Sequence, residues 1–121
     1  MKLNRIGFFR ELAHGDKTAE SLVELLGDAP RHDEQKICEY LKNGILLIAS
    51  PGVVSDVLDV DKRYIGSPSI YTDGIWAWPE VLEYYVQKYH VRLKNNFIKH
   101  IESNNYNNPT EDSVDLNNLE Y

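Results

Sequence analysis

The sequence predicts a mixed α+β domain. We expect a small, mainly antiparallel sheet with a central β-hairpin at about residues 69–78, packed by three to four helices. An Asp-Gly pair, Asp73-Gly74, lies between two short runs of aromatic and branched residues, which is typical of a hairpin turn. Apolar residues then recur at helical spacing after Pro79. Over the whole chain, short strand-like runs and helical stripes follow one another, an order that packs as α+β.

The two faces of the hairpin differ in composition. A two-residue type I′ turn at Asp73-Gly74 places Tyr71 opposite Trp76, so that Tyr71, Trp76 and Trp78 share one face. Either face could be core. If the aromatic face packs inward it is structural, and if it stays open it is a candidate surface for stacking a planar small molecule.

The first half of the chain predicts two strands and two helices. A first strand is expected within Leu3–Leu12, followed by a helix whose apolar stripe is Leu22–Leu26. Asp28-Ala29-Pro30 is typical of the start of a second helix, which Asn43-Gly44 ends. The continuous apolar run Ile45–Ala49 then predicts a central strand that is buried on both faces.

The second half predicts an edge strand, the hairpin and two helices. Branched and acidic residues alternate in Val53–Val60, which indicates a turn or a short helix before an edge strand near Tyr64-Ile65. Pro79 suits the first turn of a helix with an apolar stripe over Val81–Tyr89. A last helix is predicted over Asn95–Ser103.

Composition divides the chain into a domain and a tail. Residues 1–103 form a single globular domain, whereas residues 104–121 hold too few large apolar side chains to offset the entropy of ordering them. All 13 basic residues precede residue 102, although the net charge is −6, so the excess negative charge lies at the C-terminal end. We therefore expect an acidic C-terminal tail that is mobile in the free protein.

The charge balance and the apolar pattern exclude several classes of protein. Nucleic-acid binding needs clustered positive charge, which is missing, so a basic protein partner is the better match. No apolar run approaches the length of a membrane span or a secretory signal, and the single cysteine, Cys38, agrees with a reducing compartment. We expect a cytoplasmic protein, with Cys38 as a buried thiol on a helix.

The motifs of catalysis and metal binding are missing from the sequence. The glycines do not form a phosphate-binding loop, and His14, His32, His90 and His100 never occur in a metal-binding pair. A metal site assembled only in three dimensions, or a pairing of Cys38 with a histidine, remains open at this point. We expect no enzyme, no cofactor and no metal.

Two groups of carboxylates are the candidate partner-binding residues. Asp56, Asp59 and Asp61 lie close together but lack the spacing of a calcium loop, so a solvated acidic loop or a contact with a basic partner accounts for them. The tail adds three more acidic candidates, Glu111, Asp112 and Asp115.

Four segments together resemble a family of small cytosolic bacterial proteins. Several members act as immunity proteins of contact-dependent growth inhibition and related polymorphic toxin systems. The resemblance covers about residues 5–101 and leaves the tail outside. The segments that carry it are Ile6–Leu12 with His14-Gly15, Ser50–Leu58, Ile65–Gly74 and Trp76–Pro79.

The resemblance implies a function without an active site. An immunity protein binds and neutralises the toxic domain of its cognate effector, here expected to be a basic nuclease domain. Electrostatic attraction speeds such capture, and buried contacts slow release. The alternative is a small-molecule-binding or regulatory domain that uses the aromatic face around Tyr71, Trp76 and Trp78.

Overall fold

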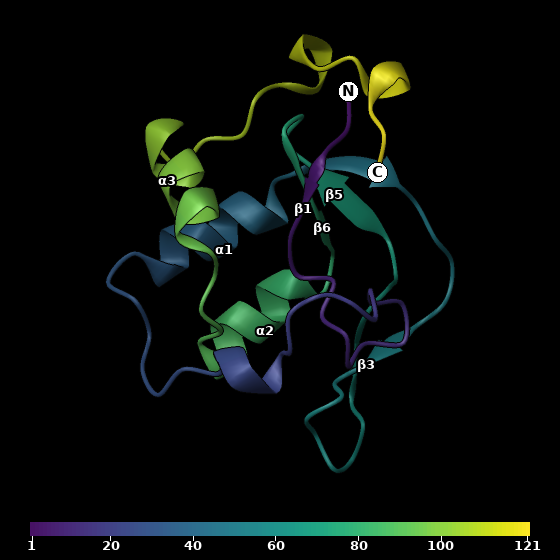
Figure 1. The fold of residues 1–121 in the computed structure, drawn as a ribbon, viewed down its shortest axis with the longest axis vertical. Coiled ribbons are helices and arrows are strands. Elements are labelled where there is room, and N and C mark those ends of the chain that lie inside the picture. Colours follow the sequence, from purple (N-terminus) through teal and green to yellow (C-terminus); the bar gives the residue numbers. More distant parts are fainter.

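The computed structural model describes residues 1–121 and confirms the α+β class (Figure 1). Its main sheet has four strands in the order β1-β6-β5-β2. Strand β1 runs parallel to β6, and the other two pairings are antiparallel. The strands are β1 (Asn4–Arg5), β6 (Trp76–Pro79), β5 (Ile70–Thr72) and β2 (Ile45–Ile48).

Three α-helices lie together on one side of this sheet (Figure 1). They are α1 (Glu34–Lys42), α2 (Leu82–Tyr89) and α3 (Asn95–Ser103), and α3 has the predicted bounds. Each turns an apolar stripe inward, and these stripes meet the tryptophans of β6 in one core cluster. None of the helices has the length and apolar character that a membrane crossing requires.

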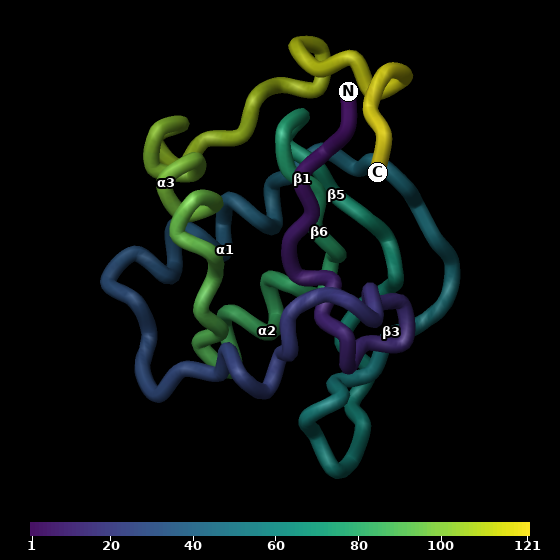
Figure 2. Tube along the Cα trace, in the orientation of Figure 1, coloured from purple at the N-terminus to yellow at the C-terminus, as the bar shows by residue number.

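The remaining elements are short. Strands β3 (Val54–Ser55) and β4 (Tyr64–Gly66) form a separate antiparallel pair, and the chain between them projects from the lower end of the molecule in Figure 2. We call residues 53–64 the arm. The three 3₁₀ turns are η1 (Val23–Leu25), η2 (Glu111–Ser113) and η3 (Leu116–Asn118).

The hairpin of β5 and β6 has a longer turn than predicted. Thr72 pairs with Ala77, and three residues, Asp73–Ile75, lie between the end of β5 and the start of β6, so the predicted two-residue type I′ turn at Asp73-Gly74 is wrong. Gly74 has a φ of 94°, but Asp73 is not in the left-handed region that a type I′ turn also demands there. Instead, the Asp73 carboxylate accepts hydrogen bonds from the backbone N–H groups of Ile75 (2.9 Å) and Trp76 (2.7 Å), which stabilise the wider turn.

The pairing of β5 with β6 is shifted by two residues relative to the predicted pairing. Because side chains alternate along a strand, the predicted faces of the hairpin are nevertheless correct. Tyr71 and Trp78 pair directly, and Trp76 lies on their face. This aromatic face packs inward: Trp78 is only 1% exposed, and Phe97 of α3 lies 4.9 Å from Trp76 and 5.9 Å from Trp78 between ring centroids. The opposite face is also buried, in a smaller cluster of Leu3, Phe8, Ile70 and Ala77.

Two predictions for the N-terminal region are wrong. The first strand is confined to Asn4–Arg5, because Gly7 has a φ of 83° and turns the chain out of the sheet. The predicted helix before Gly27 is only the turn η1. Glu11 stabilises this irregular segment, since its carboxylate accepts hydrogen bonds from the Ser21 hydroxyl and from two backbone N–H groups at the start of η1.

Strand β2 lies at the edge of the sheet, which corrects the prediction of a central strand. Only Ile45 is fully buried, and Leu46 and Ile48 are exposed. A continuous apolar run is therefore no proof of a central position. Cys38, by contrast, is buried on α1 as predicted.

The C-terminal residues return to the start of the chain (Figure 2). The Leu3 N–H donates to the Glu120 carbonyl at 2.8 Å, and the Glu120 N–H donates to the Met1 carbonyl at 2.8 Å. The segment therefore covers the outer edge of the chain beside β1. The division into a domain of residues 1–103 and a mobile tail of residues 104–121 stays a prediction.

The burial of both tryptophans predicts the fluorescence of the native protein. We expect a blue-shifted emission that acrylamide quenches weakly, because the indoles of Trp76 and Trp78 lie in the core. Unfolding in urea should move the emission to longer wavelength and restore quenching. Native emission at the wavelength of a solvated indole would contradict this packing.

Candidate functional site

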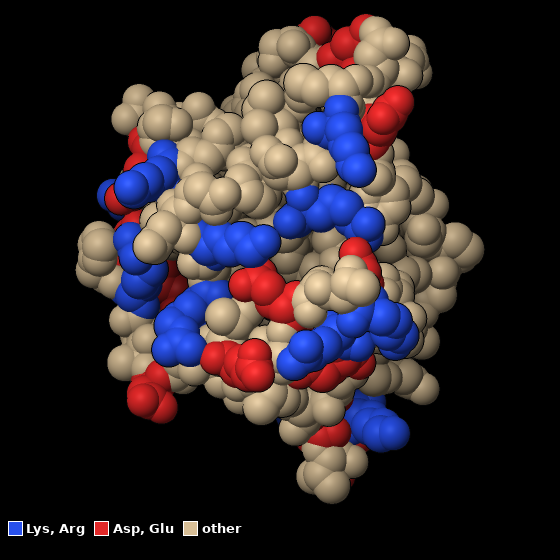
Figure 3. Space-filling view, in the orientation of Figure 1, with Lys and Arg blue, Asp and Glu red and all other residues tan.

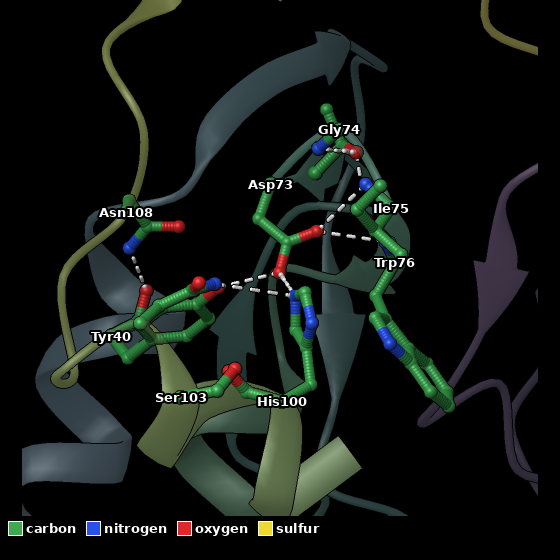
Figure 4. Close-up of polar contacts among 10 residues, drawn as sticks. Tyr40, Asp73, Gly74, Ile75, Trp76, His100, Ser103 and Asn108 are labelled. Carbon is green, nitrogen blue, oxygen red and sulfur yellow. Dashed lines mark hydrogen bonds and ion pairs between the residues drawn. The ribbon is translucent and has the colours of Figure 1, made fainter. Parts of the chain in front are cut away.

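Asp73 joins the hairpin turn to two helices. Its Oδ2 accepts a hydrogen bond from the Tyr40 hydroxyl of α1 at 2.5 Å and lies 2.8 Å from Nε2 of His100 on α3 (Figure 4). Its Oδ1 accepts the two N–H groups of the turn. Burial and the neighbouring carboxylate raise the pKa of Tyr40, so the phenol stays protonated and donates.

This Tyr-Asp-His cluster has the residue types of an acid–base site but not the access of one. The Asp73 side chain is fully buried, and both of its oxygens are occupied by hydrogen bonds. A shallow hollow of about 340 Å³ borders the cluster beside Asn104 and Asn108. We assign the cluster a structural role, because a substrate would have to displace hydrogen bonds that determine the turn.

Asp56 is the second buried carboxylate, and its position corrects the prediction of a solvated acidic loop. The residue is 0% exposed. Its Oδ2 accepts hydrogen bonds from the hydroxyls of Tyr84 (2.7 Å) and Tyr89 (2.6 Å) on α2, and its Oδ1 accepts the Leu58 N–H (2.8 Å). Asp56 therefore ties the base of the arm to α2, and its carboxylate is not exposed to solvent.

The electrostatics of Asp56 follow from these bonds. Burial acts to raise the pKa of its carboxyl, but the hydrogen bonds from Tyr89, Tyr84 and Leu58 outweigh burial and hold the pKa below its ordinary value. The same contact raises the pKa of Tyr84 and Tyr89, whose burial acts in the same direction. Asp56 thus stays ionised while both phenols stay protonated.

The other two acidic residues of the arm are largely compensated. Asp59 is half-buried, lies 3.7 Å from Nε of Arg63 and accepts the Asp61 N–H at 3.0 Å. Asp61 is exposed, next to Lys62. The arm is therefore much less acidic than its carboxylates alone suggest.

Exposed apolar side chains are the more prominent feature of the arm. Val60 is 92% exposed and Tyr64 is 73% exposed. In Figure 3 the tip, at the lower end of the view, is largely uncharged, with acidic and basic side chains above it. Extended apolar areas with a polar rim are typical of protein interaction sites, whereas one exposed apolar side chain by itself is common on protein surfaces. We define the arm surface as Val53, Val57, Val60 and Tyr64.

The sequence analysis missed the arm surface because it considered only the carboxylates of Asp56–Asp61. The available signal was the repeated insertion of valine between these acids, with no helical or strand period that would bury every valine. Such a pattern leaves apolar side chains in solvent.

The acidic residues of the tail lie far from the arm, at the opposite end of the molecule (Figures 1 and 3). Glu111 and Asp112 are exposed in the first turn of η2. Asp115 is exposed but caps η3, accepting hydrogen bonds from the Asn117 N–H at 3.2 Å and from the Asn118 amide. The six predicted partner-binding residues therefore do not form one site.

The remaining reactive groups do not assemble into a centre. Burial raises the pKa of the Cys38 thiol to about 12, which keeps it protonated and unreactive at neutral pH. No three His, Cys, Asp or Glu side chains are grouped so that they could hold a metal ion. A hollow of about 440 Å³ lies between residues 27–31 and 90–95, where His90 pairs with Glu34 at 2.9 Å.

Comparison of the chain with models of protein families, with curated proteins and with solved structures finds no match in any of the three.

Replacing Asp56 should destabilise the protein. We expect Asp56→Asn to lower the free energy of unfolding by about 1–3 kcal/mol at neutral pH, because the hydrogen bonds from Tyr84 and Tyr89 lose their charged acceptor. Urea unfolding measures the change. The matched control is Asp61→Asn, whose exposed side chain should change stability by less than about 0.5 kcal/mol.

The effect of Asp56→Asn should depend on pH. A carboxyl whose folded pKa is lowered stabilises the protein above its unfolded pKa, and this contribution is lost as the pH falls through the folded pKa. The difference between the wild-type protein and the variant should therefore shrink below the ordinary carboxyl pKa of 3.8. A difference that grows on acidification would contradict the assignment.

Proposed function

We propose that this protein is a cytoplasmic immunity protein that binds and neutralises the toxic domain of a cognate contact-dependent inhibition effector. The toxic domain is expected to be a basic nuclease, and the arm surface is proposed to contact it. The structural observation that carries the proposal is the exposure of three valines, Val53, Val57 and Val60, along an arm whose base is held by buried hydrogen bonds. The resemblance of residues 5–101 to immunity proteins supports the same function.

The apolar side chains of the arm offer binding free energy. Complete burial of one valine side chain contributes roughly 1.5 kcal/mol, and Val60 starts from nearly full exposure. The Asp56 hydrogen bonds hold the base of the arm to α2, which reduces the entropy lost when a partner binds. The arm thus combines exposed area with a preorganised base.

The overall charge favours a basic partner. The net charge of −6 attracts a positively charged domain over a distance, and Glu111 and Asp112 add exposed negative charge without a salt bridge. A nuclease domain is basic where it binds its substrate. In this proposal charge speeds the encounter, and the arm surface slows dissociation.

The small-molecule alternative has less support. It needs an open aromatic face, and Trp76 and Trp78 are buried against Phe97. A planar ligand would have to displace α3 from the sheet in order to stack on them.

The direct test is co-expression with the toxic domain of the effector that the neighbouring gene encodes. We expect growth to be restored and calorimetry to detect a 1:1 complex of the purified proteins. No complex and no protection of the cells would overturn the proposed function.

The arm surface can be tested in that complex. Val60→Ser should weaken binding about tenfold, because an exposed valine that becomes buried contributes about 1.5 kcal/mol. The matched control is Val23→Ser, since Val23 is also exposed but lies on η1. Equal affinities for the two variants would remove the arm from the interface.

A further inference from the structure

The outer edge of β2 is unpaired. Strand β2 pairs with β5 on one side only, and no backbone hydrogen bond outside the sheet involves Ile45–Ala49. The N–H and C=O groups on the free side of an edge strand can pair with another strand.

Little in the sequence protects this edge. Proteins commonly block a free edge with lysine, proline or other charged residues, yet residues 43–55 include no charged side chain and no proline within β2. The opposite side of the sheet differs from the β2 side, because the backbone of Glu120 forms hydrogen bonds with Met1 and Leu3 beside β1. On the β1 side the C-terminal segment pairs with residues 1–3, which lead into β1, whereas no segment pairs with the free side of β2.

A bulge in β2 determines toward which face of the sheet the side chains of this edge strand point. Leu46 pairs with Tyr71, whereas Ile48 pairs with Ile70, and the register shifts between them. Tyr71 and Ile70 point to opposite faces of the sheet, so Leu46 and Ile48 do as well. Leu46 is 47% exposed and Ile48 is 38% exposed. The open edge is therefore apolar on both faces.

We propose that β2 accepts an extended, uncharged segment of the toxic domain as an added strand, a docking mode that rests on the function proposed above. Backbone hydrogen bonds to β2 supply the pairing. Because the edge is apolar on both faces, the segment should have consecutive apolar residues and not the alternation of a half-exposed strand.

A partner protein fits this edge better than a second copy of the chain. Two copies with a net charge of −6 each repel one another, while a basic domain is attracted. In addition, a four-residue edge is too short to bury the roughly 1,200 Å² that a stable interface needs, so the occupant must contact a second surface.

The arm surface provides this second contact. Ile48 and Val53 are five residues apart in the chain, a span of at most about 18 Å. A domain that pairs with β2 can therefore reach Val53, where the arm begins.

The edge can be tested without the toxin. The probe is the peptide acetyl-Lys-Ile-Val-Val-Ile-Lys-amide, titrated into the ¹⁵N-labelled full-length protein. We expect the amide signals of Ile45–Ile48 to shift and their hydrogen exchange to slow. The same peptide with every apolar residue N-methylated lacks the donors for pairing and should leave these signals unchanged. Equal shifts with both peptides, or none with either, would overturn the pairing.

A charged side chain on the edge should prevent docking. We expect Leu46→Lys to weaken binding of the peptide and of the toxic domain about fivefold or more, since a cross-strand apolar pair is lost. The matched control is Val23→Lys, which adds the same charge at another exposed position. Circular dichroism verifies that both variants fold.

The outcomes separate this inference from the proposed function. If the wild-type protein binds the toxic domain and Leu46→Lys binds it equally well, docking at β2 is wrong and the immunity function stands. If the wild-type protein does not bind the toxic domain, the proposed function fails and the source of the added strand is wrong with it. A dimer in analytical ultracentrifugation that Leu46→Lys abolishes would assign the edge to a second copy instead.

Discussion

The buried carboxylate of Asp73 is the interaction on which the fold depends. A buried polar group is tolerated only where hydrogen bonds replace the lost water, and Asp73 obtains these from its own turn and from Tyr40 and His100. The same contacts join the hairpin to α1 and α3. The aromatic face of the hairpin can then pack against Phe97, because the helices that cover it are held to the turn at its end.

The same principle gives the acidic residues of the arm different roles. The Asp56 carboxylate accepts hydrogen bonds from α2, and Arg63 largely compensates the charge of Asp59. Neither carboxylate therefore contributes much negative charge at the surface. What the arm presents to solvent is its valines. Long-range attraction of the proposed basic partner would then come from the overall charge and from Glu111 and Asp112 at the other end of the molecule.

The open edge of β2 and the arm surface are consecutive in the chain. Both are uncharged: β2 makes up most of the apolar run Ile45–Ala49, and the arm begins at Val53, shortly after this run. The C-terminal segment covers the opposite side of the sheet. The stretch from Leu46 to Tyr64 therefore holds both the unpaired strand edge and six of the ten exposed large hydrophobic residues.

The sequence by itself determined the α+β class, the bounds of α3, the burial of Cys38 and the shared face of Tyr71, Trp76 and Trp78. These features follow from local periodicity and turn chemistry. Only the tertiary structure decided that β2 is an edge strand, that Asp56 is buried and that the arm surface is exposed. Periodicity records how apolar a segment is, but not which neighbour covers it. The sequence does not distinguish a carboxylate that water hydrates from one, such as Asp56, that accepts hydrogen bonds from two tyrosines of a distant helix.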